Sequence, residues 1–357
     1  MQPFIYTAMP ARVVFGSGTL AEVAVELRRL GCSRALVLAT PPQEQDARGL
    51  ADRLGDLAAG VFAEAAMHTP TDVTARGLAR ARELGADGLV AIGGGSTTGL
   101  GKAIALRTGL PQVVIPTTYA GSEATPILGE TENGRKTTRR GPEILPEVIV
   151  YDVDLTLTLP AGLSVTSGIN AVAHAVEALY AEGANPVTSM LAEAGIAALA
   201  RALPAIVADP GNRAARSDAL YGAWACGTCL GAVGMALHHK LCHVLGGAFD
   251  LPHAETHTVV LPHAVAFNAP AAPEAMARAA GALGAPDVAQ GLFDLARGLG
   301  APTGLREIGM PGAGLDQAAD LVAALPPWNP RPIERDAIRR LLDDAWHGRR
   351  PAAAGAA

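Results

Sequence analysis

The sequence contains few cysteines: Cys32, Cys226, Cys229 and Cys242 are the only four among 357 residues. They are too few and too widely spaced for a disulfide framework, and they suit a reducing compartment. Cys226 and Cys229 form a CxxC pair, which in a zinc site would need a second pair of ligands. Because this pair lies in an apolar, helical stretch, we interpret both side chains as buried packing residues.

Basic charge, aromatic residues and uninterrupted apolar runs are also scarce. The net charge is −6 and aromatic residues make up 4%; without a basic excess we expect no nucleic-acid partner. The segment Met1–Gly16 lacks the basic start and the apolar core of a signal peptide. Apolar stretches such as Ala192–Ala208 are interrupted by Glu193, Arg201 and Pro204, so we expect no membrane span. These absences predict a cytoplasmic, globular protein.

The length and the pattern of the first half predict an α/β domain. A chain of 357 residues is long enough for two domains with large cores. Short β-branched runs alternate there with helical stretches such as Thr19–Leu30 and Val73–Leu84, which predicts a parallel sheet covered by helices. The expected strands are Arg12–Phe15, Ala35–Ala39, Gly88–Ile92, Gln112–Pro116 and Glu147–Tyr151.

The second half has a helical pattern only. After Asp154 the β signal fades, and long apolar-periodic stretches predict helices at Leu163–Tyr180, Pro186–Ala208 and Arg213–Leu237, with more after Pro273. We therefore expect an α/β domain over residues 1–157 and an all-helical domain over 158–350, joined within Asp152–Ala161. Residues 351–357 are expected to form a disordered tail.

A glycine-rich loop follows one of the predicted strands. Gly93-Gly94-Gly95-Ser96 comes directly after Gly88–Ile92 and precedes a helical stretch that contains Lys102. Glycines there let backbone amides approach a diphosphate at a helix N-terminus. A tight turn that needs positive φ explains the same glycines, and the pattern is not the GxGxxG fingerprint. Lys102 either adds positive charge to this site or faces solvent.

A second polar loop follows the strand that ends at Pro116. It contains Thr117, Thr118 and Ser122, whose hydroxyls suit ribose or phosphate oxygens, although ordinary turn chemistry explains each of them alone. Loops at the carboxyl ends of strands mark the usual ligand site of such sheets. After Ala35–Ala39 the chain continues with Thr40 and two prolines, without the acid that would bind a ribose 2′-hydroxyl or the arginine that would bind a 2′-phosphate. We therefore expect a dinucleotide site that accepts NADH or NADPH.

Histidines crowd into one short segment of the predicted helical domain. Six of the nine histidines lie there, namely His238, His239, His243, His253, His257 and His263. His239 and His243 are four residues apart and so share a helix face, as do Asn170 and His174. A lone histidine is usually structural, but this density favours a functional cluster. We expect Asn170, His174, His239 and His253 to converge in a cleft between the two domains that the glycine loop also faces.

These motifs together resemble the iron-containing alcohol dehydrogenase superfamily. Gly93–Ser96, Pro116–Thr118, Leu155–Pro160 and the spacing of His239, His243 and His253 carry the resemblance. It implies the dehydroquinate synthase-like fold, a dinucleotide in the first half and a divalent metal in the helical half.

The resemblance also implies where a metal would bind. Asn170, His174, His239 and His253 match the family's metal ligands, and His243 matches a histidine near the nicotinamide. Asn170 stands where the family has aspartate, and Gly99 stands where it usually has another aspartate.

One branch of this superfamily shares these departures. Gly93–Lys102, the additional Tyr119 in the threonine loop, Gly168–Glu177 and His238–His257 resemble the maleylacetate reductases. Membership implies that NADH or NADPH saturates the C=C bond of maleylacetate, or of substituted maleylacetates, to give 3-oxoadipate during the breakdown of aromatic compounds. It further implies a small dicarboxylate as substrate and a homodimer.

The chemistry of such a substrate fits the loss of a metal-binding carboxylate. Hydride addition to an enone develops charge on a conjugated enolate, which hydrogen-bond donors or cations can stabilise without a Lewis acid. Three histidines could still hold zinc, so a metal is disfavoured but not excluded.

We expect His243 to donate the proton, with His253 as the next candidate. Lys240 either binds a substrate carboxylate or faces solvent, and Tyr119 joins the catalytic candidates through the resemblance. His257 and His263 are interpreted as structural. Two alternatives remain, a metal-dependent alcohol dehydrogenase of the same superfamily and a non-catalytic dinucleotide-binding protein.

Overall fold

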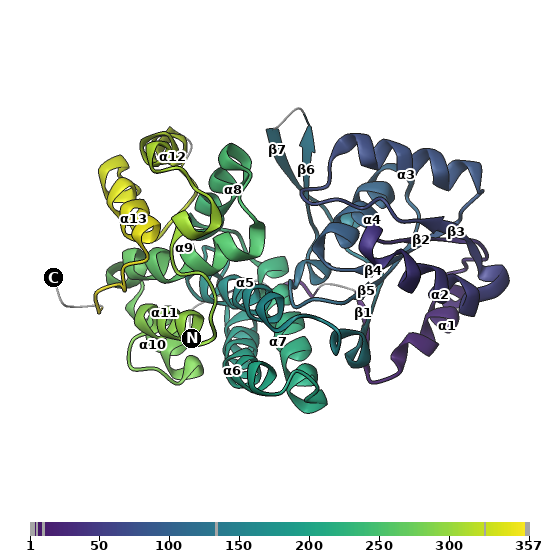
Figure 1. The fold of residues 1–357 in the computed structure, drawn as a ribbon, viewed down its shortest axis with the longest axis horizontal. Coiled ribbons are helices and arrows are strands. Elements are labelled where there is room, and N and C mark those ends of the chain that lie inside the picture. Colours follow the sequence, from purple (N-terminus) through teal and green to yellow (C-terminus); the bar gives the residue numbers. More distant parts are fainter. Residues whose placement is uncertain (1–3, 5, 9–10, 133–134, 325, 354–357) are drawn as a thin grey trace. The chain divides into compact units, whose positions relative to one another are not determined.

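The computed structural model describes residues 4, 6–8, 11–132, 135–324 and 326–353. The chain divides into two compact units, one of residues 9–159 and one of residues 160–357 together with the first eight residues. The first unit is an α/β layer structure and the second is helical, as Figure 1 shows from β1 to β8 (purple to blue-green) and from α5 to α13 (teal to yellow). The predicted fold class is thereby confirmed.

A six-stranded parallel sheet forms the centre of the α/β unit, with the strand order β1-β8-β5-β4-β2-β3. Its strands are β1 (Arg12–Gly16), β2 (Ala35–Leu38), β3 (Ala58–Phe62), β4 (Gly88–Gly93), β5 (Gln112–Pro116) and β8 (Val148–Asp152). Every residue of β2, β4, β5 and β8 is buried, which is why these segments are continuous apolar runs rather than alternating ones. All five predicted strands are present within one residue of their expected bounds.

Helices cover both faces of this sheet. On one face α1 (Val23–Arg29) and α2 (Glu44–Leu54) pack their apolar residues against inward residues such as Val37 and Val90. On the other face α3 (Thr71–Glu83) and α4 (Gly95–Thr108) pack against the alternate residues of the same strands, such as Leu38 and Leu89. Because successive side chains of a strand point to opposite faces of the sheet, each strand contributes to the hydrophobic core on both faces.

Several elements of this unit were not predicted from the sequence. Strand β3 has the weak signal Ala-Ala-Gly-Val-Phe, and α2 has a largely polar surface. An antiparallel hairpin of β6 (Ile127–Glu132) and β7 (Arg135–Arg140) is rich in charged residues and lies outside the main sheet. None of these segments carries the apolar run on which strand prediction depends.

The helical unit begins with three long helices that pack on one another, α5 (Ala161–Tyr180), α6 (Pro186–Ala208) and α7 (Arg213–Ala232). The remaining helices are α8 (Leu237–Phe249), α9 (His253–Asn268), α10 (Pro273–Leu283), α11 (Val288–Gly298), α12 (Leu315–Ala324) and α13 (Arg335–His347). The predicted helix Arg213–Leu237 is wrong at its end, because the chain leaves the helix at Val233 in an extended conformation. Leu237 instead starts α8, which is bent by 98° from α7.

Helix α6 has the composition of a membrane span. Among the described residues it is the only unbroken helix that is long and apolar enough to cross a membrane, with a mean hydropathy of 1.6. It packs along α5, α7 and α10. A buried core helix can have the same length and apolar composition as a membrane span. The expectation that the chain does not span a membrane stays a prediction.

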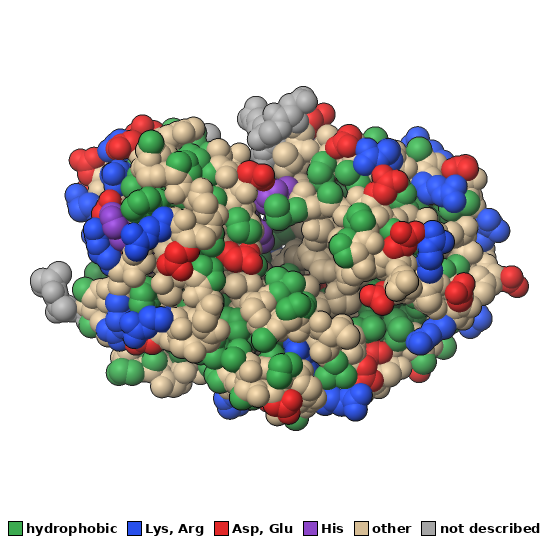
Figure 2. Space-filling model, in the orientation of Figure 1, with side chains coloured by type: hydrophobic (Ala, Val, Ile, Leu, Met, Phe, Trp, Pro, Cys, Tyr) green, Lys and Arg blue, Asp and Glu red, His purple; other side chains and the backbone are tan. Residues whose placement is uncertain are grey.

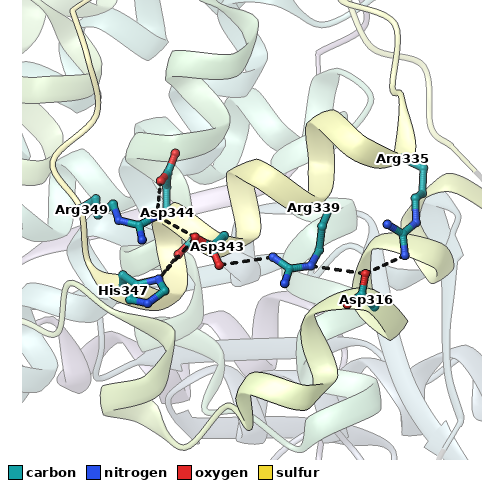
Figure 3. A network of polar contacts seen from close by, with 7 residues as sticks. All are labelled: Asp316, Arg335, Arg339, Asp343, Asp344, His347 and Arg349. Carbon is teal, nitrogen blue, oxygen red and sulfur yellow. Dashed lines mark hydrogen bonds and ion pairs between the residues drawn. The ribbon is translucent and has the colours of Figure 1, made fainter.

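The C-terminal helices are fastened by ion pairs on their outer side. Figure 3 shows Arg335 and Arg339 of α13 reaching Asp316 of α12, and Arg349 pairing with Asp343 and Asp344. Such exposed pairs contribute little individually.

The expected disordered tail begins with an ordered residue instead. Pro351 is buried, and its carbonyl accepts a hydrogen bond from Gln290 at 3.1 Å; residues 354–357 lie outside the described part.

Acidic and basic side chains are interspersed over the face shown in Figure 2.

Candidate active site

The glycine loop of the α/β unit lies at the carboxyl edge of the sheet. The strand order reverses between β2 and β4, and the crevice at such a reversal is where open parallel sheets bind ligands. Gly93 ends β4 with φ 153°, and a Cβ there would collide with the Thr97 hydroxyl. Gly94 is the N-cap of α4, and a Cβ there would lie 2.9 Å from the Thr118 methyl carbon. The glycines therefore let two loops approach each other at a helix N-terminus.

The predicted cofactor residues after β2, β4 and β5 are brought together. The Gln43 amide donates to the Thr117 hydroxyl at 3.1 Å, and the Thr40 hydroxyl donates to the Gln43 side-chain oxygen at 3.1 Å. The Thr117 amide donates to the Gly93 carbonyl at 3.0 Å. Gln43, which sequence reasoning missed, thus links Thr40 to Thr117 across the reversal point. Gly95 is exposed, and Ser96 is partly exposed.

Lys102 takes neither of the two roles considered for it. Its side chain is 1% exposed, and its ammonium donates to the carbonyls of Ser122, Thr125 and Ile127 at 2.6–3.0 Å. Burial lowers the pKa of Lys102 to about 7, partly offset by the nearby Glu123 carboxylate. Lys102 therefore fastens the segment that follows the threonine loop to helix α4, and it does not extend toward a phosphate or toward solvent.

The rest of the threonine loop is anchored in the same way. Glu123 is 1% exposed, and its carboxylate accepts the Tyr151 hydroxyl at 2.8 Å. Burial raises the pKa of Glu123. Tyr119 is fully buried, and Ser122 keeps a buried hydroxyl without a hydrogen-bond partner among the described residues. Lys102 and Glu123 thus position this loop from buried sites.

Gly99 has a steric explanation. A Cβ at this position would collide with the Thr69 hydroxyl, so any larger residue here requires the Thr69 side chain to move. Thr69 and His68 both adopt positive φ, 48° and 64°, which non-glycine residues rarely do without a local constraint. This strained segment comes within contact distance of the first turns of α4.

The helical unit gathers the predicted histidines into one cluster. The ring centroids of His174 and His239 are 5.2 Å apart, and those of His239 and His243 are 6.4 Å apart. His253 reaches the same cluster through His257, whose ring is 4.4 Å from His253 and 5.2 Å from His239. Asn170 lies one helical turn before His174 on α5. Helices α5, α8 and α9 each contribute to this histidine cluster.

His257 is part of the cluster, although we interpreted it as structural. Its Nδ1 shares a hydrogen bond of 2.9 Å with Nε2 of His238, and the Cys242 thiol lies 3.7 Å from the same Nε2. Burial lowers the pKa of His257, His238 and His174 well below the usual range, and neighbouring histidines lower them further. These three rings are therefore neutral donors or acceptors at neutral pH.

His263 lies apart from the cluster. Its ring packs edge-on against Phe293 at 6.5 Å, and burial lowers its pKa to about 4. His243, His253 and Lys240 are partly exposed, so ligands can reach them. The CxxC pair behaves as interpreted, because Cys226 and Cys229 are both buried and free.

Glu177 contacts the histidine cluster, and the predictions omitted it. It is fully buried on α5, seven residues after Asn170 and three after His174, so the three lie on one helix face. One carboxylate oxygen accepts the backbone N–H of His238 at 2.8 Å, and the other contacts Nδ1 of His239. The i, i+4, i+7 spacing of Asn170, His174 and Glu177 is the signal that could have found it.

The residues at the family's metal position fit a divalent ion poorly. Among described residues, the one group of three His, Cys, Asp or Glu side chains with ligand atoms within 4.8 Å of one another is His238, Cys242 and His257, where a hydrogen bond already joins the two rings. Histidine ligands usually donate their second nitrogen to an acceptor. Nδ1 of His239 meets the Glu177 carboxylate in this way, whereas Nδ1 of His174 has no such partner in the described part of the chain. Asn170 also supplies no negative charge.

Comparisons with known proteins agree on the family. Residues 10–153 match the model of iron-containing alcohol dehydrogenases, and residues 164–346 match the C-terminal model of the Fe-containing alcohol dehydrogenase family. The chain is 61% identical over 351 residues to the maleylacetate reductase of Rhizobium sp. (strain MTP-10005), covering 98% of this chain and 100% of that protein. It is 57% identical to the maleylacetate reductase of Sphingobium indicum, covering 98% and 99%.

A solved structure extends this similarity to the fold. The maleylacetate reductase of Agrobacterium tumefaciens superposes with a TM-score of 0.94 at 61% identity, covering 98% of this chain and 100% of that chain.

Proposed function

The chain belongs to the maleylacetate reductases of the iron-containing alcohol dehydrogenase family, and we propose that it reduces the C=C bond of maleylacetate to give 3-oxoadipate in the breakdown of aromatic compounds. The observation that carries this function is the 61% identity to a maleylacetate reductase over nearly the whole chain. The histidine cluster, with asparagine at position 170, supports it. The enzyme is an oxidoreductase.

The reaction balances with one reduced nicotinamide and one proton. Hydride adds to the alkene carbon β to the ketone, the π electrons move onto the ketone oxygen as an enolate, and a proton then adds to the α carbon. Donors aimed at the enolate oxygen stabilise the charge as it develops. We assign the proton donation to His243, with His253 as the alternative, because both rings are partly exposed within the cluster. Lys240 is proposed to bind a substrate carboxylate.

The cofactor proposal is NADH or NADPH, held at the carboxyl edge of the sheet. Gly93, Gly94, Gly95 and Ser96 would offer backbone amides to the diphosphate at the start of α4. Thr40, Thr117, Thr118 and Ser122 would contact the nucleotide's hydroxyl and phosphate oxygens. Directly after β2 the chain continues with Ala39, Thr40 and two prolines, without an acid that would repel a 2′-phosphate, which supports use of both cofactors.

We also propose that catalysis does not need a divalent metal. The amide of Asn170 and the missing acceptor for His174 Nδ1 support this proposal. The cytoplasmic location is supported by four buried free cysteines. The homodimer rests on the resemblance alone, and analytical ultracentrifugation tests it.

The test is oxidation of NADH by the purified protein with maleylacetate, with and without a chelator. We expect turnover with maleylacetate that is unchanged by EDTA, little turnover with simple aldehydes, and oxidation of NADPH as well. Aldehyde turnover that the chelator abolishes would support the metal-dependent alcohol dehydrogenase instead. NADH binding without oxidation across enones and aldehydes would support a non-catalytic protein and contradict the proposal.

A further inference from the structure

Gln43 connects the ends of two strands across a third strand of the parallel sheet. Its side-chain oxygen accepts the Thr40 hydroxyl after β2 at 3.1 Å, and its side-chain amide donates to the Thr117 hydroxyl after β5 at 3.1 Å. Because β4 lies between β2 and β5, the side chain crosses the end of β4 at Gly93. A Cβ at Gly93 would lie 2.8 Å from the Gln43 oxygen, so glycine leaves room for this crossing.

The two hydroxyls that Gln43 connects present different groups to a ligand. A hydroxyl has one proton to donate and two lone pairs that accept. The Thr40 proton is donated to the Gln43 oxygen, so Thr40 offers a ligand only lone pairs. The Thr117 hydroxyl accepts from the Gln43 amide, and among the described residues no acceptor takes its own proton. Gln43 thus makes Thr40 an acceptor and leaves Thr117 a donor.

An acceptor at Thr40 distinguishes the two nicotinamide cofactors. In sheets of this kind the residue after the strand beside the glycine loop faces the adenosine ribose, where an acid commonly accepts the 2′-hydroxyl. A 2′-hydroxyl can donate to a Thr40 lone pair, whereas the ionised oxygens of a 2′-phosphate only accept and are repelled by it.

We propose that Gln43 is a positioning residue that fixes Thr40 as a hydrogen-bond acceptor, and that it thereby favours NADH over NADPH in a site that takes both. The inference rests on the proposed cofactor site at the carboxyl edge of the sheet. It adds to that proposal a residue that does not touch the cofactor, and a direction of preference that the absence of an acid after β2 does not supply.

The Kd for NADPH divided by the Kd for NADH isolates this effect. The diphosphate, the nicotinamide and the contacts of Thr117 are common to both nucleotides, so a change there cancels in the ratio. Gln43→Met preserves the length of the side chain but removes both hydrogen bonds, and the Thr40 hydroxyl can then turn and donate to a 2′-phosphate. We expect the ratio to exceed one in the wild type and to fall by about 3–10-fold in this variant, the effect of one hydrogen bond.

Two further variants test whether Gln43 acts through Thr40. In a Thr40→Val background, Gln43→Met should leave the ratio unchanged, because the hydroxyl that Gln43 orients is absent. Gln45→Met is the matched control, since Gln45 is an exposed amide two residues further along, on α2, and its loss should not change the ratio. A wild-type ratio below one, an unchanged ratio in Gln43→Met, or an equal fall in the Thr40→Val background would overturn the proposal.

A cofactor analogue provides a test on the wild-type protein, which does not depend on the folding of a variant. NADH that contains 2′-deoxyadenosine lacks the donor that Thr40 accepts, so it should bind about 3–10-fold more weakly than NADH. Equal affinity of the two would overturn the proposal. Fluorescence titration without maleylacetate supplies each Kd. If the protein binds NADH but does not reduce maleylacetate, the proposed reaction fails while the ratios still decide the role of Gln43.

Discussion

Replacing Lys102 by methionine tests how the cofactor loop is held in place. Methionine fills a similar volume but cannot donate, so the carbonyls of Ser122, Thr125 and Ile127 lose a charged donor at 2.6–3.0 Å. Three charge-assisted hydrogen bonds contribute about 5–9 kcal/mol. Against this, the lowering of the Lys102 pKa from 10.5 to about 7 corresponds to a desolvation cost of about 5 kcal/mol. The net loss of stability is about 0–4 kcal/mol.

Thermal unfolding and NADH titration measure the two consequences. A loss of about 2 kcal/mol, the middle of that range, lowers Tm by roughly 4–8 °C for a unit of this size. The Kd for NADH should rise by about tenfold, equivalent to about 1.4 kcal/mol, because Thr117 and Thr118 directly precede the released segment. The NADH titration is carried out well below the Tm of the variant, so that a weaker cofactor site is not confused with global unfolding.

A matched control separates the loop from a general loss of charge. Arg48 pairs with Glu44 on the surface of α2, and Arg48→Met should change stability by less than about 1 kcal/mol. If Lys102→Met keeps the wild-type Tm and Kd for NADH, the buried ammonium does not hold the loop and the reasoning is wrong.

Three further measurements test the site and the stability of the helical unit. His243→Ala should lower kcat by about 10²–10⁴-fold with little change in the Kd for NADH; near-normal turnover in both His243→Ala and His253→Ala would show that the cluster is structural. Elemental analysis should find no stoichiometric zinc or iron, and Asn170→Asp should raise the affinity for zinc; stoichiometric metal with chelator-sensitive activity would refute the metal-free proposal. Because burial lowers the pKa of His263 to about 4, the unfolded state takes up the His263 proton before the folded state as the pH falls below about 6.5. The free energy of unfolding therefore decreases by about 3 kcal/mol by pH 4. Urea titrations of His263→Leu should show a smaller decrease in this free energy at acid pH, and a pH dependence identical to that of the wild type would contradict this.

Local patterns in the sequence were enough to predict most of the fold and to select most of the histidines that the structure gathers into one cluster. Strands β2, β4, β5 and β8 are buried apolar runs, and buried parallel strands carry that signal without any knowledge of their neighbours. The placement of loops at their carboxyl ends then follows from topology. The histidines were found because four-residue spacing on a helix puts side chains on one face.

The contacts between distant segments needed the tertiary structure. Glu177 and His239 are 62 residues apart, and Lys102 meets acceptors 20–25 residues further along the chain. The close contact that a side chain at Gly99 would make is with Thr69, which lies on a separate loop.

The physical reason is that the period of a helix or strand fixes which way a side chain faces, but not what it meets there. The sequence by itself therefore determined the two kinds of domain, the glycine loop and the histidine faces. Only packing between elements decided that Lys102 is buried, that His257 joins the cluster, and that a carboxylate on α5 holds the ring of His239.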